Sequence, residues 1–301
     1  MTALLYRNFP FARTPPMRPR RLLTLVRRAL AAFKQDYAAS MGAAIAYYTV
    51  FSLAPLLVIV IAVAGMVFGR EAVTGVIVAQ VGGLIGNEGA AFVQALIRNA
   101  SDPERGLIAG TVSGAVLILG ATTVFAELQR ALDRIWRVPA AEKPSGIWAL
   151  LRGRLLSFGL ILGLAFLLMV SLVVSTAVAA LGEWTRGMLP GWEMVLHATN
   201  TVVSLAIETL LFSMIFKLMP STEIAWRDVW IGGAVTAVLF EVGKLLIGLY
   251  LGKSAMTESF AAAGSLVVLL AWVYYAAQIF LLGAEFTKVY ADTEGSLKPD
   301  R

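Results

Sequence analysis

Six long apolar runs constrain the fold of this chain more than any other feature of its sequence. Each is about as long as the ~20 residues that a helix needs to cross the hydrocarbon core of a bilayer. The runs are continuously apolar, whereas strands of a membrane β-barrel alternate apolar and polar residues. The sequence therefore predicts an all-α, polytopic membrane protein with six transmembrane helices. The runs are Met41–Phe68, Leu107–Phe125, Leu155–Leu181, Met194–Met219, Val229–Leu251 and Gly264–Phe286.

The composition leaves little room for a soluble domain beside these helices. Of 301 residues, 58% are hydrophobic and 15% are charged, against roughly 25% charged in soluble domains. The absence of cysteine and the presence of a single histidine exclude disulfides and leave almost no material for a metal site. The sequence also lacks a nucleotide-binding fingerprint or a catalytic constellation. We therefore expect no enzyme, no cofactor and no metal.

The distribution of basic residues predicts the orientation in the membrane. Of the 25 Lys and Arg residues, 19 fall in the two terminal regions and in the second and fourth connections between the runs. Cytoplasmic segments carry such an excess, so both termini are predicted to be cytoplasmic. The same distribution explains the net charge of +6 without nucleic acid, and membrane lipids are the expected partners.

Three regions follow from this topology. Residues 1–40 form a basic cytoplasmic tail that ends in an amphipathic helix, which begins near Arg20 and lies on the anionic inner leaflet. Residues 41–290 form the six-helix membrane domain, and residues 291–301 form a second cytoplasmic tail.

The connection between the first two runs has its own pattern. Apolar residues recur at helical spacing over residues 71–100, interrupted by Gly82-Gly83 and by Gly86-Asn87-Glu88-Gly89. This pattern predicts two short amphipathic helices at the outer interface. They either pack on the interface or form a lid or re-entrant gate.

Ionisable residues inside the apolar runs are candidates for function, because each is costly at membrane depth. Glu208 lies within the fourth run, and Glu241 and Lys244 lie three residues apart on the fifth, where they can neutralise each other. The three residues either line a polar pathway or make buried structural contacts. Pro55 lies within the first run and is predicted to kink its helix.

A second charged group follows the second run, at the predicted cytoplasmic mouth. Glu127, Arg130, Asp133 and Arg134 alternate in sign at helical spacing. They form either a solvated, salt-bridged helix or a site for an anion or a lipid headgroup. Glu285, near the inner end of the last run, is a possible partner for this cluster.

Several stretches resemble the YihY/virulence-factor BrkB family of bacterial inner-membrane proteins. The resemblance implies six spans, an inner-membrane location and a link to envelope or lipid-precursor handling. Some members once carried a ribonuclease label, which the residues of this chain do not support. The matching stretches are Ala46-Tyr47-Tyr48, Phe51-Ser52-Leu53-Ala54-Pro55-Leu56-Leu57, Gln129-Arg130-Ala131-Leu132-Asp133-Arg134-Ile135-Trp136, Gly243-Lys244, Ile247-Gly248-Leu249-Tyr250, Gly264-Ser265, Trp272-Val273-Tyr274-Tyr275, Gln278 and Gly283-Ala284-Glu285-Phe286-Thr287.

Two functional hypotheses follow. In the first, the chain moves an amphiphile, a lipid precursor or a small solute across the inner membrane, and an anionic lipid is the favoured cargo because of the basic inner mouth. In the second, it is a scaffold that docks envelope protein partners without transport. An intramembrane enzyme is the least favoured reading. The sequence leaves substrate, energy source and oligomeric state open.

Overall fold

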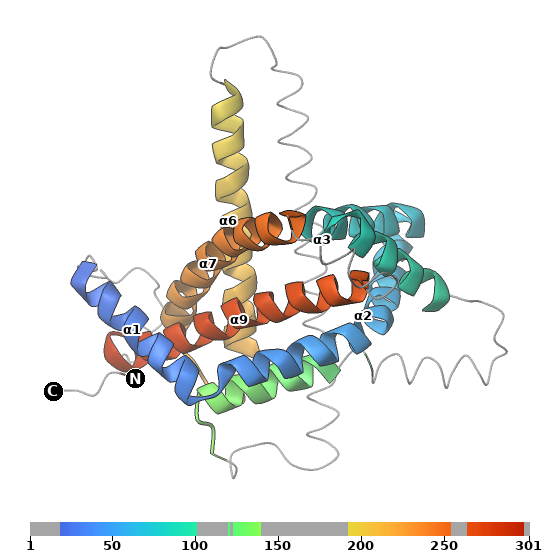
Figure 1. The fold of residues 1–301 in the computed structure, drawn as a ribbon. Helices are drawn as coiled ribbons and strands as arrows, with labels where there is room; N and C mark the ends of the chain where they lie inside the picture. Colours follow the sequence, from blue (N-terminus) through green and yellow to red (C-terminus); the bar gives the residue numbers. More distant parts are fainter. Residues whose placement is uncertain (1–18, 101–119, 121–122, 140–191, 254–263, 298–301) are drawn as a thin grey trace, which may run out of the picture.

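The computed structural model describes residues 19–100, 120, 123–139, 192–253 and 264–297 (Figure 1). Within these ranges the chain is helical and contains no strand, so the all-α prediction is confirmed there. A helical stretch without a label covers residues 123–135. The labelled helices are α1 (Pro19–Gln35), α2 (Ala38–Phe68), α3 (Arg70–Ala100), α6 (Trp192–Leu218), α7 (Trp226–Lys253) and α9 (Gly264–Thr293).

Four helices in the described ranges are long and apolar enough to cross a membrane. They are α2, α6, α7 and α9, with spanning segments Ala38–Ala62, Ala198–Leu218, Trp226–Ile247 and Leu266–Thr293. They coincide with four of the six predicted runs. The other two, Leu107–Phe125 and Leu155–Leu181, lie largely or wholly outside the described residues, so six spans and the orientation of the termini stay predictions.

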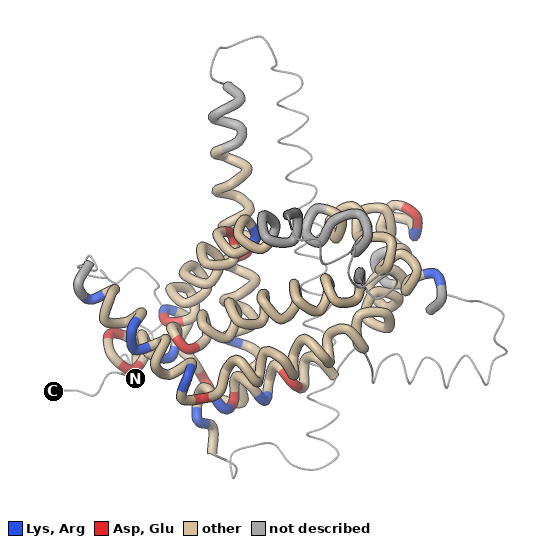
Figure 2. Tube along the Cα trace, viewed as in Figure 1, with Lys and Arg blue, Asp and Glu red and all other residues tan. Residues whose placement is uncertain are grey.

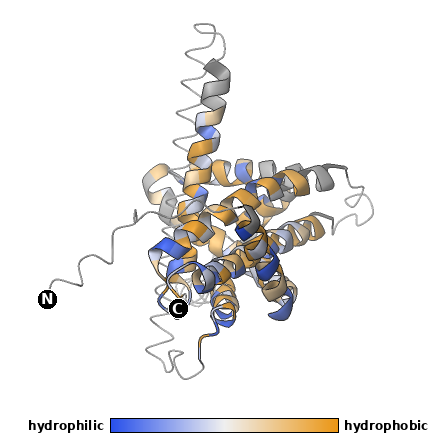
Figure 3. Ribbon diagram, turned by 90° about the vertical axis from the view of Figure 1, so that its left-hand side faces the viewer, coloured by the Kyte–Doolittle hydropathy of each residue, from blue (hydrophilic) through white to orange (hydrophobic). Residues whose placement is uncertain are grey.

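The four spanning helices form a bundle in which α9 is central. Helix α9 packs between α2 and α7, and α6 packs on the other side of α7 and extends beyond its neighbours (Figure 1). Hydrophobic residues cover much of the helices, their outward faces included (Figure 3). Charged residues gather at the end of the bundle that holds α1 and the C-terminal end of α9 (Figure 2).

A reciprocal pair of glycines and threonines brings α7 and α9 together. A side chain at Gly232 on α7 would collide with Thr287 on α9, and one at Gly283 on α9 would collide with Thr236 on α7. Each threonine hydroxyl donates to the glycine carbonyl four residues earlier on its own helix, at 2.7 Å. Small residues at such a seam let the two backbones approach closely.

A fully buried core lies at one end of this bundle. Leu132 and Ile135 of the stretch 123–135, Phe216 of α6 and Leu281 of α9 are fully buried in one cluster. The turn after α6 closes over this core, since Lys217 donates its Nζ to the carbonyl of Ile224 at 2.5 Å. Contacts from four parts of the chain therefore fix this end.

Helix α1 confirms the amphipathic helix that the sequence predicts to begin near Arg20. It meets α2 at Tyr37, whose backbone is left-handed with φ of 56°. One edge of α1 packs on α9, where Leu25 and Ala29 lie against Phe286 and Tyr290. The N-terminal helix is thus attached to the bundle.

Helix α3 differs in part from the two short helices predicted for residues 71–100. The structure assigns one helical element, Arg70–Ala100, through the glycines that were expected to break it. This element is not straight, because a Cβ placed on Gly82 would lie 3.6 Å from the Cβ of Ala90, whereas eight residues of a straight helix span about 12 Å. The two arms fold back on each other, and Val73 and Val93 pack in one cluster with residues of α2.

Candidate functional site

An ion triad joins α6 and α7 within their membrane-spanning segments. The Nζ of Lys244 lies 2.9 Å from Oε1 of Glu208 and 2.8 Å from Oε1 of Glu241. Glu208 lies on α6, and both other residues lie on α7, one turn apart. The structure therefore brings together all three intramembrane residues that the sequence singled out.

The packing of α6 against α7 positions this triad. Ser213 of α6 is buried and donates its hydroxyl to the carbonyl of Val229 at the start of α7, at 3.1 Å. The ring of Phe240 packs edge-on against that of Phe212, with centroids 5.6 Å apart. The ammonium group of Lys244 lies 5.5 Å from the centre of the Phe240 ring, within the range of a cation–π contact.

The triad is neither fully buried nor electrically balanced. The side chains of Glu208, Glu241 and Lys244 keep 19%, 35% and 27% of their surface exposed. Two carboxylates face one ammonium group, so the formal charge is −1 when all three are ionised. The second carboxylate oxygen of Glu208, Oε2, is buried and has no hydrogen-bond partner in the described structure. A buried acceptor without a hydrogen-bond donor costs free energy, and a bound group that donates a hydrogen bond to it would remove this cost.

The predicted cluster at the cytoplasmic mouth is divided in the structure. Glu127 and Arg130 form an exposed ion pair at 2.8 Å, as the alternative of a solvated, salt-bridged helix predicts. Asp133 instead turns inward and accepts hydrogen bonds from the backbone N–H and the hydroxyl of Ser221, at 2.7 and 3.0 Å. Arg134 lies 5.9 Å from the centre of the Tyr37 ring. These side chains therefore do not converge on one anion site.

Glu285 is nearly inaccessible, with 1% of its surface exposed. Its charged neighbours are Asp36 in the turn between α1 and α2, Lys288 on its own helix, and Arg137 after the stretch 123–135. Its Oε1 has no hydrogen-bond partner in the described residues. The structure thus places Glu285 opposite another carboxyl group, and among the described basic residues of the second connection it is Arg137 that lies near it.

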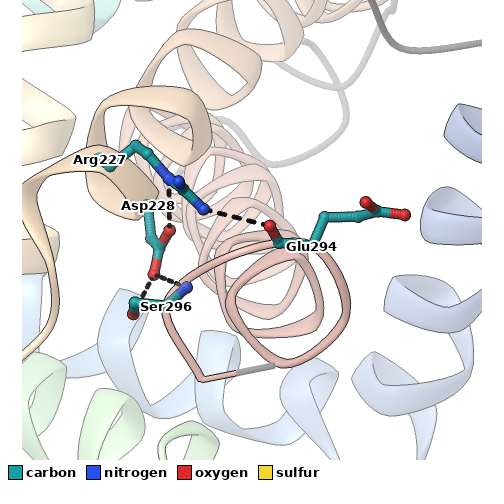
Figure 4. Close-up of polar contacts among 4 residues, drawn as sticks. All are labelled: Arg227, Asp228, Glu294 and Ser296. Carbon is teal, nitrogen blue, oxygen red and sulfur yellow. Dashed lines mark hydrogen bonds and ion pairs between the residues drawn. The ribbon is translucent and has the colours of Figure 1, made fainter. Parts of the chain in front are cut away.

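Asp228 ties the beginning of α7 to the end of α9 (Figure 4). It is fully buried, and its Oδ2 accepts hydrogen bonds from the backbone N–H and the hydroxyl of Ser296, at 3.1 and 2.5 Å. The neighbouring Arg227 donates to the carbonyl of Glu294 at 3.1 Å. An acidic residue in the first turn of a helix also complements the helix dipole, so these contacts stabilise the helix ends.

Pro55 lies inside α2, where a side chain added to Gly120 would approach its ring to 3.1 Å. The predicted kink stays a prediction. Among the residues whose placement is described, no group of three His, Cys, Asp or Glu side chains is arranged to hold a metal ion.

Comparison with known proteins assigns the family. The virulence factor BrkB family matches residues 29–301. The chain belongs to this family. The resemblance drawn from its motifs is therefore confirmed. The matched range of this BrkB-family chain includes the triad, Asp133 and Asp228.

The BrkB-family chain is similar to several bacterial UPF0761 membrane proteins. It is 28% identical to one from Ralstonia nicotianae over 88% of this chain and 58% of the relative. The identity is 28% for one from Verminephrobacter eiseniae, over 85% and 59%, and 29% for one from Rhodospirillum centenum, over 87% and 56%. The chain thus spans less than two thirds of these relatives. No solved structure matches it.

Sequence reasoning missed the roles of three acids of this chain, of which Asp133 and Asp228 are buried. It placed Asp133 in a cluster that was either solvated or an anion site, gave Asp228 no role and overlooked Asp36 beside Glu285. One signal was available for Asp228, because an acid in the first turn after Pro220-Ser221-Thr222 is typical of a helix start. The partners of the others lie in distant segments, which no local pattern reveals.

Proposed function

We propose that this BrkB-family chain moves or handles an amphiphile at the bacterial inner membrane, with Glu208, Glu241 and Lys244 as its polar lining. The observation that carries the proposal is the partly exposed ion triad between two spanning helices. A buried ion pair is weak evidence for stability, because apolar residues of similar volume often serve as well. An ionisable group at membrane depth is by default a candidate for function, because it is costly there.

The charge balance of the triad indicates the class of cargo. Lys244 carries three N–H donors, and two point to the carboxylates of Glu208 and Glu241. The third makes no hydrogen bond within the described residues, and Oε2 of Glu208 lacks a donor there. A headgroup with a phosphate beside an ammonium group supplies both the acceptor and the donor. We therefore favour a zwitterionic aminophospholipid over the purely anionic lipid that the basic mouth alone suggested.

The distribution of charge supports the setting of this proposal. The end of the bundle that gathers most charged residues also holds α1 and the end of α9 (Figure 2). With the excess of Lys and Arg in the terminal regions, this favours cytoplasmic termini in a bacterial inner membrane. The triad then lies between two leaflets whose lipids it can contact.

Lipid exchange in proteoliposomes tests the proposal. The purified full chain is reconstituted with fluorescently labelled phosphatidylethanolamine or phosphatidylglycerol, and a membrane-impermeant reductant reports the label that reaches the outer leaflet. We expect Glu241→Gln and Lys244→Met each to slow exchange of phosphatidylethanolamine about tenfold, the equivalent of about 1.4 kcal/mol in the barrier.

Asp292→Asn is the matched control. It also removes a carboxylate that pairs with a lysine, Lys288, at 3.1 Å, but its side chain is 46% exposed and lies at the end of α9. Exchange by this variant should equal that of the unmodified chain. If both triad variants exchange lipid at the unmodified rate, the pathway is wrong, and crosslinking for stable envelope partners becomes the test of the scaffold hypothesis.

A further inference from the structure

The apolar half of α1 is only partly covered by the protein. Leu25 and Ala29 are buried against α9, with 4% and 1% of their surfaces exposed. Neighbouring positions on the same half of the helix stay open, with 39–55% of their surfaces exposed, and we call them the open edge. The open edge consists of Leu22, Leu23, Val26 and Leu30.

Basic side chains border this open edge. Arg27 and Lys34 are exposed, and neither forms an ion pair with an acidic residue in the part of the chain that the structure describes. At 100° per residue, Lys34 and Arg27 directly follow Leu23 around the helix. Arg28 and Arg21 lie on the far side, beyond the buried Leu25, and Arg21 lies 3.7 Å from Glu294. The helix thus presents an apolar strip beside a basic strip.

The contacts of α1 fix its depth relative to the spanning helices. Leu25 and Ala29 share a cluster with Ile231 and Val235 of α7, which lie about 8 and 14 Å along the axis from the start of that helix at Trp226. Trp226 and Trp230 are themselves 47% and 40% exposed at this end. Exposed tryptophans at the end of a spanning helix are typical of the membrane interface, so α1 lies level with it.

We propose that α1 is a docking surface for anionic phospholipid, held in the interface by its attachment to α9. Acyl chains cover the open edge, and headgroup phosphates bind Arg27 and Lys34. Lysine and arginine stems reach from apolar depth to the headgroups in this way. The proposal does not depend on the triad, which lies on other helices.

The features of the open edge favour lipid over a second copy of the chain. Four side chains make a small patch compared with the ~800 Å² that each partner buries in a stable protein interface. A second copy would also bring the same positive charges against Arg27 and Lys34, and like charges across an interface are unfavourable.

Spin labels on α1 in the full chain test this proposal. The chain has no native cysteine, so Val26→Cys, Leu30→Cys and Ala31→Cys each give one labelling site. Ala31 is the matched control, because it is exposed on the polar side of α1 next to Leu30. In nanodiscs of phosphatidylglycerol, dissolved oxygen should accelerate the spin relaxation of labels at 26 and 30. A water-soluble nickel chelate should instead accelerate that of the label at 31.

The headgroup preference is measured separately. Spin-labelled phosphatidylglycerol and phosphatidylcholine report which lipid the chain retains in mixed bilayers. The Arg27→Gln/Lys34→Gln variant should lose several-fold of its preference for phosphatidylglycerol, since each basic residue near an anionic surface contributes up to about fivefold. Arg70→Gln, at the exposed first residue of α3, should leave that preference unchanged.

Three results would overturn the proposal. Relaxation by the nickel chelate at both 26 and 30 would place the open edge in water. Dipolar broadening between labels of two chains would make a second copy the occupant. An unchanged headgroup preference in the Arg27→Gln/Lys34→Gln variant would remove the anionic lipid from the site.

Discussion

Lys244 on α7 donates a hydrogen bond to Glu208 on α6 at 2.9 Å, across 36 positions of the sequence. A second hydrogen bond, to Glu241 on its own helix, measures 2.8 Å. One ammonium group therefore pairs with carboxylates from two spanning helices. Because opposite charges attract strongly where water is scarce, Lys244 holds α6 and α7 in register as well as lining the proposed pathway.

Removal of the lysine should destabilise the protein more than removal of all three charges. Lys244→Met leaves the carboxylates of Glu208 and Glu241 facing each other without a cation, at an expected cost of about 1–3 kcal/mol. The variant Glu208→Gln/Glu241→Gln/Lys244→Met carries no charge and should recover most of this loss. Thermal unfolding in detergent measures both. If the triple variant is the less stable, the ion pairs contribute net stability.

The seam between α7 and α9 should be intolerant of a single methyl group. In Gly283→Ala the added Cβ would lie 2.8 Å from the Cβ of Thr236, so the helices must separate, at an expected cost of about 1–3 kcal/mol. Gly75→Ala is the control, because nothing lies within 4 Å of its added Cβ, and alanine favours a helix by up to about 1 kcal/mol. Opposite shifts in melting temperature support the seam. Equal shifts contradict it.

What the sequence could predict depends on how local each feature is. The four described spans and the pairing of Glu241 with Lys244 follow from composition and helical spacing. Glu208 as partner of Lys244 could not be predicted, because it depends on how α6 packs against α7. The same reason explains the inward turn of Asp133, whose partner Ser221 is 88 positions away. A sequence of alternating charges at helical spacing is compatible with a solvated face, and only the packing of the helix shows which charged residue turns inward.

The course of α3 was predicted in part for a related reason. Gly82-Gly83 and the later glycines indicate where the segment folds back, but glycine weakens a helix by only about 1 kcal/mol. Packing of Val73 and Val93 against α2 stabilises both arms, so helical backbone continues through the bend. Local propensity located the bend, and tertiary contacts decided its geometry.

A distance measurement should detect this bend. Ala72 and Ala95 are exposed on the two arms of α3, and cysteines there take spin labels without competition from native cysteine. A straight helix would separate these positions by about 35 Å. We expect double electron–electron resonance to give a clearly shorter distance in nanodiscs. A distance near that of the straight helix would contradict the folded-back arms and the joint packing of Val73 and Val93.

The contact between Asp228 and Ser296 should stabilise the fold, and this effect should exceed that of removing an exposed surface charge. Asp228→Ala removes the acceptor of two hydrogen bonds at a fully buried position, and we expect a loss of about 1–3 kcal/mol. Ser296→Ala keeps the backbone N–H contact and should lose less. Asp292→Asn, on the exposed side of the same helix end, should stay within about 0.5 kcal/mol. Thermal unfolding separates them, and equal effects of Asp228→Ala and Asp292→Asn would refute the role.

Replacement of Glu285 by its neutral isostere should stabilise the protein. Glu285 is 1% exposed, faces Asp36 and leaves Oε1 without a partner in the described structure. An uncompensated buried acid is costly, whereas the amide of Glu285→Gln can donate to Asp36. We expect a gain of about 1 kcal/mol, seen as a higher melting temperature. Asp36→Asn should act in the same direction, and the double variant should gain less than both together, since the residues are coupled. A lower melting temperature for Glu285→Gln would show that Lys288 and Arg137 hold a carboxylate that the protein needs.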